Sequence, residues 1–202
     1  MSHLQQLIYF ASIARRFPRY FEGVRVLEIG SLNINGSIRQ FFRGCEYLGV
    51  DLGPGPDVDL VCAGQDLALP DASFDVTCST ECFEHNPHWR ETFANMIRMT
   101  RPGGMVCVTC ATEGRPEHGT RRTTPTDSPF TSVDSDYYRN LVADDFRQAL
   151  DLDEAFAWHE FHVDHTSFDL YFCGLRPPLP ADLGKAQLYP APEDYPRVVS
   201  VS

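Results

Sequence analysis

Short apolar runs alternate with longer, more polar intervals along the chain. Five runs rich in Val, Leu, Phe and Cys predict successive strands, at residues 24–29, 46–51, 58–62, 74–80 and 105–111. Two further runs, at 156–163 and 168–175, are separated by the polar turn DHTS and predict a hairpin. Segments with helical spacing lie between several strands. This alternation predicts an α/β fold with a mostly parallel sheet.

The N-terminal segment is predicted to be an amphipathic helix. Its apolar stripe, expected to pack on the domain, consists of Leu4, Leu7, Ile8 and Ala11. The apolar run is short, glutamines interrupt it, and its arginines follow it, which is not the order of a secretory signal. No stretch approaches the roughly 20 apolar residues that span a bilayer. We therefore expect a cytoplasmic protein without a membrane partner.

The clearest helix lies between the fourth and fifth strands. Its apolar stripe consists of Trp89, Phe93, Met96 and Ile97. Asn86 is the predicted N-cap, and Pro87 is expected in the first turn, where its missing N–H costs nothing. A further helix is predicted over residues 137–150.

A long polar loop, residues 112–136, follows the fifth strand. Loops of this length in compact domains are usually functional lids or disordered segments. The tail from Arg176 carries several prolines and is predicted to be extended. We expect a single domain, divided into an N-terminal helix at 1–22, a core at 23–176 and a Pro-rich tail at 177–202.

Net charge and cysteine content limit the binding partners that the chain is expected to have. The 202-residue chain has a net charge of −11 and a pI near 4.9, which argues against nucleic acid, because phosphate binding depends largely on Lys and Arg. Seven scattered cysteines are typical of thiols in a reducing compartment. Cys107 and Cys110 would point to opposite faces of a strand, so they are not expected to share a disulfide or a metal. His162 and His165 are poor evidence for a metal site, and none is predicted.

The segment VRVLEIGSLNINGS, residues 24–37, leads from a strand through glycine and polar residues toward a helix. Such a turn exposes backbone N–H groups to a ligand. The GxGxxG spacing of dinucleotide enzymes is missing, which disfavours a nicotinamide-dependent oxidoreductase. Asp51 ends the second strand, where an acidic side chain can accept hydrogen bonds from both hydroxyls of a ribose. The pattern therefore predicts a site for a polar small molecule.

Together these features resemble the class I S-adenosylmethionine-dependent methyltransferases of the type 11 group, from about Val24 to Leu175. VLEIG is similar to the first motif of the family, and GVD is similar to its ribose-binding position. DLALPDASFDV is similar to the segment near the adenine. CSTECFEH and RPGG are similar to the end of the fourth strand and the start of the fifth. The resemblance implies a Rossmann-like seven-stranded sheet, mostly parallel, with an antiparallel last strand and helices on both faces. It also implies S-adenosyl-L-methionine as the cofactor and S-adenosyl-L-homocysteine as its product.

The resemblance assigns cofactor contacts to single residues. Gly30 and Ser31 would cradle the methionine portion with backbone atoms, and Glu28 would help to order the loop or the ammonium group. Asp51 would hold the ribose hydroxyls, with Leu52 against the adenine face.

Three more residues complete this set. Asp66 would accept a hydrogen bond from the adenine amino group beside Leu67, and Glu81 would lie at the cofactor edge after the fourth strand. Glu28 and Asp66 could instead cap a helix or pair with an arginine.

The sequence departs from the family in two places. EIGSLNINGS replaces the usual EIGxGxG, so Asn33, Asn35 and Ser37 either contact the cofactor or cap the next helix, and the cap is favoured. LGPGPD, between the second and third strands, is too short for a helical crossover. A loop is therefore expected there, and it would leave the adenine side of the cofactor site open.

Residues that handle the methyl acceptor must come from loops at the carboxyl edge of the sheet. Transfer requires an aligned acceptor lone pair, and a hydroxyl or ammonium acceptor also requires a general base. The candidate bases are His118, His85 and Tyr137. The candidate substrate-binding residues are Arg115, Glu117, Arg121, Arg122, Tyr138 and His165. For each histidine, a hydrogen-bonded structural role is the alternative.

Arg115, Arg121 and Arg122 give the long loop local positive charge in an acidic protein. A small-molecule acceptor is expected, and because guanidinium groups suit carboxylate or phosphate, it is proposed to carry an anionic group. The competing interpretation is that these arginines are solvated or pair with Asp127, Asp134 and Asp136. The alternatives are a non-catalytic S-adenosylmethionine-binding partner subunit and a methyltransferase acting on a protein. The sequence does not predict the oligomeric state.

Overall fold

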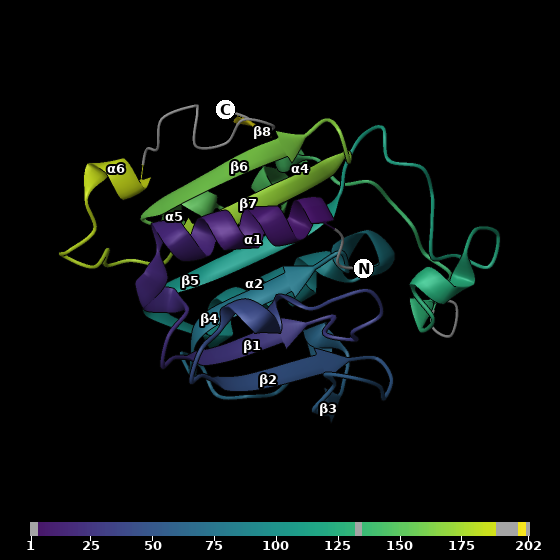
Figure 1. Cartoon of the computed structure of the whole chain (residues 1–202), viewed down its shortest axis with the longest axis horizontal. Coiled ribbons are helices and arrows are strands. Elements are labelled where there is room, and N and C mark those ends of the chain that lie inside the picture. The colour runs from purple at the N-terminus through teal and green to yellow at the C-terminus, as the bar shows by residue number, and fades with distance from the viewer. Residues whose placement is uncertain (1–3, 132–134, 189–197, 201–202) are drawn as a thin grey trace.

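The computed structural model describes residues 4–131, 135–188 and 198–200, which form one mixed sheet with helices on both faces (Figure 1). The strand order is β3-β2-β1-β4-β5-β7-β6-β8. The strands are β1 (Arg25–Ile29), β2 (Glu46–Asp51), β3 (Leu60–Val61), β4 (Phe74–Thr80), β5 (Thr100–Ala111), β6 (Trp158–Asp164), β7 (Asp169–Leu175) and β8 (Val198–Ser200). All seven predicted strands are present, and the predicted Rossmann-like α/β class is confirmed. The unpredicted β8 comes from the tail.

Strand directions define the edge at which ligands can bind. The strands β1 to β5 run parallel to one another, and β7 is antiparallel to both β5 and β6. The predicted antiparallel last strand of the core is therefore confirmed. Because β6 runs parallel to β5, the β6–β7 turn lies at the same edge as the carboxyl ends of the parallel strands.

Helices cover the sheet from both sides. The helix α1 (Leu4–Arg16) packs in one core, whereas α2 (Trp89–Met99) and α4 (Ala143–Ala149) pack in the other. The short helices are α5 (Leu152–Ala155), α6 (Lys185–Leu188) and the 3-10 turns η1 (Pro18–Tyr20), η2 (Ile38–Phe41), η3 (Gly64–Asp66), η4 (Phe83–His85) and η5 (Pro125–Asp127). Across the described ranges, no helix combines the length and apolar character that crossing a membrane requires.

Side chains of β5 alternate between the two cores, as predicted for a strand. Cys107 belongs to the core beneath α1, and Cys110 belongs to the core beneath α2 and α4. All seven cysteines are free thiols. The CxxC of this strand is therefore a packing feature, as the alternation of strand side chains requires.

The apolar stripe predicted for α1 is only partly right. Leu7 packs against the core, but two other residues of the stripe face solvent. Leu4 and Ile8 are 65% and 50% exposed. The buried face is formed instead by Gln6, Tyr9, Phe10 and Ile13. Tyr9 stacks on Tyr171 of β7 with ring centroids 4.3 Å apart. Aromatic rings bury more apolar area than the aliphatic residues of the predicted stripe, so the helix packs with its aromatic face against the sheet.

Two helices begin later than predicted. The helix α2 starts at Trp89, because the Asn86 side chain accepts a hydrogen bond from the His88 N–H at 2.8 Å within a turn, which leaves His88 at the cap position. The helix α4 starts at Ala143. Residues 137–142 are not helical, since the Arg139 N–H bonds to the Glu84 carbonyl within η4 and the Leu141 N–H bonds to the Ala111 carbonyl at the end of β5.

Candidate functional site

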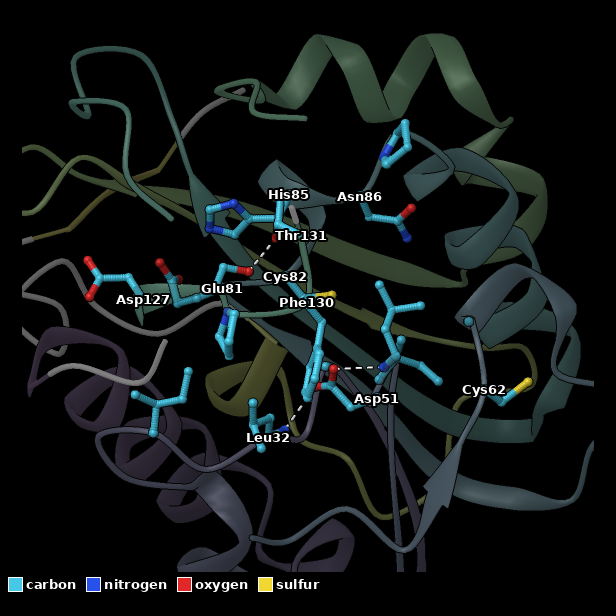
Figure 2. A pocket seen from close by; sticks show the side chains of 18 of the residues that line it. Leu32, Asp51, Cys62, Glu81, Cys82, His85, Asn86, Asp127, Phe130 and Thr131 are labelled. Carbon is cyan, nitrogen blue, oxygen red and sulfur yellow. Dashed lines mark hydrogen bonds between the residues drawn. The ribbon is translucent and has the colours of Figure 1, made fainter. Parts of the chain in front are cut away.

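A pocket lies at the carboxyl ends of β1, β2 and β4 (Figure 2). Its wall comes from segments within 29–34, 51–52, 62–65, 81–87 and 127–131. The predicted site residues in this wall are Gly30, Asp51, Leu52, Glu81 and His85. The last segment belongs to the long loop after β5, so this loop closes one side of the pocket.

Phe130 joins the long loop to the connection between β2 and β3. A Cβ on Gly53 would lie only 2.2 Å from the Phe130 ring, so glycine allows the ring to rest directly on the backbone. Phe130 also lines the pocket. Sequence reasoning predicted a lid in this loop, but a lone aromatic residue among polar ones gave no sign of where it would dock. We call residues 127–131 the lid segment.

The loop after β1 turns sharply at Gly30. Its φ is +79°, and the N–H groups of Gly30 and Ser31 both donate to the Val50 carbonyl, at 2.8 and 3.1 Å. A Cβ at Gly30 would lie 2.6 Å from the Cβ of Cys82. Both the conformation and the close approach of the segment after β4 therefore require glycine here.

The polar side chains of this loop bond to its own backbone, and Ser37 caps the element that follows. Ser37 Oγ accepts from the Arg39 N–H at 3.1 Å, and Asn33 Oδ1 accepts from the Gly36 N–H at 2.9 Å. The capping role favoured for Ser37 is therefore confirmed. The element that it caps is only the four-residue η2.

Asp51 presents a carboxylate to the pocket. Its Oδ2 accepts from the Leu32 N–H at 3.0 Å, and its Oδ1 accepts from the Leu52 N–H at 2.7 Å. Burial raises the pKa of Asp51, and these two backbone hydrogen bonds oppose the shift. Since a carboxylate has about four lone-pair positions, both oxygens can accept one bond more. The group therefore suits a ligand with two adjacent hydroxyls.

Glu28 does not line the pocket. It is buried in β1, where its Oε2 accepts from the Tyr47 hydroxyl at 2.7 Å and its Oε1 accepts from the Thr80 hydroxyl at 3.3 Å. Burial raises the pKa of Glu28 to about 7, although both hydroxyl donors oppose the shift. Its observed partners favour a supporting role beneath the loop over direct contact with a ligand.

Glu28→Gln is expected to remove a pH dependence of stability. The folded protein holds the Glu28 proton more tightly than the unfolded chain, whose pKa is near 4.5. Wild-type stability should therefore fall by up to about 3 kcal/mol as pH rises from below 4.5 through about 7, a loss that the variant lacks. Urea unfolding of both proteins from pH 5 to 8 measures the difference. Tyr47→Phe removes a hydrogen bond that lowers the pKa of Glu28, so the loss of stability should move to higher pH. If the stability difference between wild type and Glu28→Gln stays constant with pH, Glu28 is not the origin of the pH dependence.

Besides Glu28, three more predicted cofactor residues lie outside the pocket wall. Asp66 is exposed at the end of η3, Leu67 is buried in the core beneath α2, and Ser31 is buried with no described hydrogen-bond partner for its Oγ. Cys62 and Gln65 line the pocket from the same region. The sequence did not single them out, because neither belongs to a motif.

Glu81 lies at the turn from β4 to η4. Its φ is +51°, although it is not glycine, and it is 5% exposed. Its Oε1 accepts from the Thr109 hydroxyl of β5 at 2.9 Å. A left-handed conformation costs a non-glycine residue about 1–3 kcal/mol, and such strain gathers at functional sites. Glu81 is therefore held firmly at the pocket wall, where it was predicted.

η4 and the long loop bring together a cluster of titratable side chains. The ring centroids of His85, His118 and Tyr138 lie 5.0 to 5.4 Å apart. Burial lowers the pKa of His85 to about 3 and also lowers the pKa of His118, so both imidazoles are neutral at neutral pH. Burial raises the pKa of Glu84, which is fully enclosed. The sequence identified the two histidines and Tyr138 but missed Glu84.

Two arginines of the long loop have acidic partners. Arg115 pairs with the fully buried Asp169 at 3.2 Å. Arg122 pairs with Glu117 at 2.8 Å and with Asp136 at 3.7 Å, although its side chain is 64% exposed. Arg115 is thus an anchor of the loop, whereas Arg122 remains accessible.

The remaining predicted residues lie at the same edge but outside the pocket wall. The Arg121 N–H donates to Asp136 Oδ1 at 2.7 Å. Tyr137 is partly buried where the long loop ends, and His165 is exposed in the turn between β6 and β7. Their roles stay predictions.

The match to known families covers the strands that build this pocket. Residues 27–108 match the model of a family described as a methyltransferase domain. A search of the curated proteins finds no match.

Solved structures share the fold. YcgJ from Bacillus subtilis is 13% identical, with a TM-score of 0.52 over 82% of this chain and 98% of its own. A phosphoethanolamine N-methyltransferase 2 from Haemonchus contortus, in complex with phosphomonomethylethanolamine and S-adenosylhomocysteine, is 17% identical, with a TM-score of 0.59 over 84% of this chain and 52% of its own. The 1,6-didemethyltoxoflavin-N1-methyltransferase of Burkholderia thailandensis, bound to 1,6-didemethyltoxoflavin and S-adenosylhomocysteine, is 18% identical, with a TM-score of 0.55 over 84% and 78%. At sequence identities this low, the comparison shows that these proteins share a fold with this chain and nothing more.

Proposed function

We propose that this chain, whose residues 27–108 match a methyltransferase domain, is a class I S-adenosylmethionine-dependent methyltransferase that methylates a small-molecule acceptor bound beside the pocket at the carboxyl edge of its sheet. The observation that carries the proposal is the Asp51 carboxylate, fixed by two backbone N–H groups and facing this pocket. The acceptor capacity left on its oxygens fits the two hydroxyls of a ribose.

The residues around Asp51 fit the rest of the cofactor. Gly30 brings the backbone to the pocket wall, and Leu52, 47% exposed, offers an apolar surface beside Asp51. Glu81 follows β4, which lies beside β1 on the side away from β2 and Asp51. We therefore propose that Gly30, Asp51, Leu52 and Glu81 contact the cofactor.

S-adenosylmethionine supplies a methyl group that its sulfonium has already activated. The protein then has to align the acceptor lone pair with the methyl carbon and exclude water. The lid segment is suited to water exclusion, because Phe130 rests on Gly53 across the pocket. Tyr138 and His118 fix the other end of the long loop, since both side chains contact the Pro116 carbonyl, at 3.2 and 3.1 Å.

The acceptor itself is proposed to lie between the pocket and the long loop. His85 lines the pocket, and its ring contacts His118. His118 is the first proposed base, with His85 and Tyr137 as further candidates; burial lowers the pKa of His85 to about 3, which makes it the weaker proton acceptor. Two neighbours of the same fold carry small-molecule acceptors in their structures, one of them a phosphate ester, which supports an acceptor of this size.

An anionic acceptor would be recognised by Arg122. In paired assays, esterifying the anionic group is expected to reduce kcat/KM about tenfold or more, because a charged hydrogen bond contributes about 1.5–3 kcal/mol. The measurement is S-adenosylhomocysteine release from acceptor panels that contain each anion and its neutral analogue. Arg122→Gln should weaken only the anionic members.

Arg19→Gln is the matched control, since Arg19 pairs with Asp182 and lies in η1, outside the pocket wall. Equal rates for neutral and anionic analogues would contradict the anionic preference. Cofactor binding without turnover of any acceptor would favour the partner-subunit alternative.

A further inference from the structure

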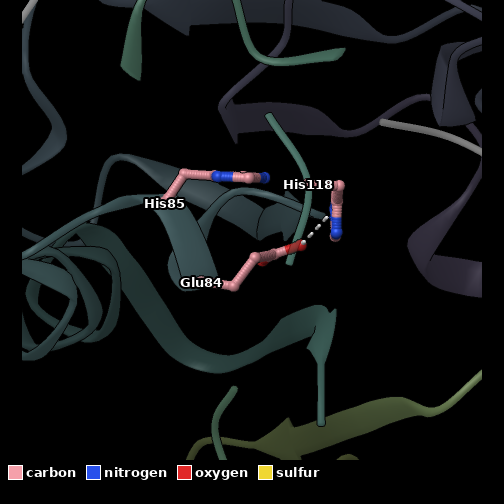
Figure 3. Close-up of side chains that lie close together, drawn as sticks. All are labelled: Glu84, His85 and His118. Atoms are coloured by element: carbon pink, nitrogen blue, oxygen red, sulfur yellow. Dashed lines mark ion pairs between the residues drawn. The ribbon is translucent and has the colours of Figure 1, made fainter. Parts of the chain in front are cut away.

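Glu84, His85 and His118 are arranged as ligands around a common point, and we propose that they bind a divalent first-row transition metal ion such as Mn²⁺, Co²⁺ or Zn²⁺ (Figure 3). One nitrogen or oxygen atom from each side chain lies within 4.8 Å of the others. Glu84 and His85 come from η4, and His118 comes from the long loop after β5. The site would therefore fasten this loop to the end of β4.

Glu84 supplies the strongest argument for a missing partner. Its side chain is 0% exposed, and neither carboxylate oxygen has a hydrogen-bond partner among the described residues. The nearest basic atom is His118 Nε2, 4.0 Å from Oε1, which is too far for a hydrogen bond. An isolated carboxylate is costly to bury, and a cation between Glu84 and the histidines would remove that cost.

His118 is oriented as a metal ligand usually is. Its Nδ1 lies 3.1 Å from the Pro116 carbonyl, and in this contact Nδ1–H donates. The lone pair is then on Nε2, the atom nearest to Glu84. A ligating histidine almost always donates its other N–H to a carbonyl or carboxylate in this way, because the bond fixes both tautomer and ring orientation.

His85 is also held in place with a free ring nitrogen. It is 8% exposed, and its Nδ1 has no hydrogen-bond partner in the described parts of the chain. A Cβ on Gly119 would lie 2.7 Å from His85 Cε1, so the loop backbone packs directly on the ring. Gly119 has φ +66°, and this approach needs glycine on both counts.

The distances and ligand types fit a transition metal. Ligand atoms bound at about 2.0–2.2 Å to one ion lie about 3–4 Å apart, so the observed separations of up to 4.8 Å need only small side-chain movements. Two imidazoles with one carboxylate suit Mn²⁺, Co²⁺ or Zn²⁺, whereas Mg²⁺ and Ca²⁺ prefer oxygen ligands alone. Three protein ligands also leave positions for water or an acceptor oxygen.

The location connects the ion with the proposed reaction. His85 lines the pocket, so an ion bound there could hold an acceptor oxygen beside the cofactor. This role rests on the proposed function, whereas binding of the ion does not. With an ion bound, His85 and His118 would position it instead of accepting the acceptor proton.

Metal titration of the untagged, chelator-treated protein tests the proposal. Calorimetry with MnCl₂ and the visible spectrum with CoCl₂ should show one ion per chain. Glu84→Gln and His118→Gln should each weaken binding by more than about 10- to 100-fold, the loss that follows when only an outer-shell partner of a ligand is removed. His88→Gln, which removes an exposed histidine three residues from His85, is the matched control and should bind as wild type does.

Circular dichroism and S-adenosylhomocysteine titration of each variant separate loss of the metal from loss of the fold or of the cofactor site. Metal binding that is absent from folded wild type, or that survives equally in His118→Gln and Glu84→Gln, would overturn the proposal. A protein that binds S-adenosylhomocysteine but no metal would refute the metal site alone. A protein that binds metal but no S-adenosylhomocysteine would refute the proposed function alone.

Discussion

Asp51→Ala is expected to weaken S-adenosylmethionine binding at least 100-fold. The wild-type carboxylate is already fixed by the N–H groups of Leu32 and Leu52, so it can accept the two ribose hydroxyls without reorganisation. Two hydrogen bonds to a charged group contribute about 3 kcal/mol or more together, and 1.4 kcal/mol corresponds to a factor of ten. Calorimetric titration with S-adenosylmethionine and S-adenosylhomocysteine measures the loss directly.

Matched variants separate the carboxylate from the fold. Asp144→Ala removes an exposed aspartate of α4 that pairs with Arg147, and it should leave binding unchanged. Asp51→Asn keeps the shape of the side chain but removes its charge and should still lose about tenfold. Asp66→Ala tests the residue expected to hold the adenine amino group. Wild-type affinity in Asp51→Ala would show that the ribose lies elsewhere.

The sheet was predictable because its strands are short, apolar and bounded by polar turns. β1, β2, β4, β6 and β7 match the predicted runs to within two residues at each end. The end of β2 also placed Asp51 at the pocket wall, since the carboxyl ends of parallel strands meet at one edge. A motif that lies at a strand end can therefore be located from the sequence.

Features that depend on packing between distant segments were not predictable. The N-cap of α2 was misplaced, because the Asn86 side chain bonds within its own turn. The role of Glu84 becomes visible only when the long loop brings His118 to η4, across 33 intervening residues. Asp66 matched a motif, yet it is exposed beyond the pocket wall. Local patterns specify where strands end, but they do not specify how a 25-residue loop packs on them.

Gly30→Ala is expected to destabilise the protein by about 3 kcal/mol and to weaken cofactor binding as well. Two costs add in this estimate. A left-handed conformation costs a non-glycine residue about 1–2 kcal/mol, and Gly30 has φ +79°. The new Cβ would also lie 2.6 Å from Cys82 Cβ and 2.8 Å from its Sγ, and overpacking of this kind costs about 1–3 kcal/mol.

Gly44→Ala separates the two costs. Gly44 has φ +60°, but a Cβ there would meet nothing within 4 Å, so this variant should lose only about 1 kcal/mol. Urea unfolding of both variants measures the difference. Replacing Cys82 with glycine in the Gly30→Ala background should recover about 1 kcal/mol or more, because it removes the atoms that the new methyl group meets. Equal losses in Gly30→Ala and Gly44→Ala would mean that the backbone after β4 moves aside freely, and the pocket wall at Cys82 would then be flexible instead of fixed by close packing.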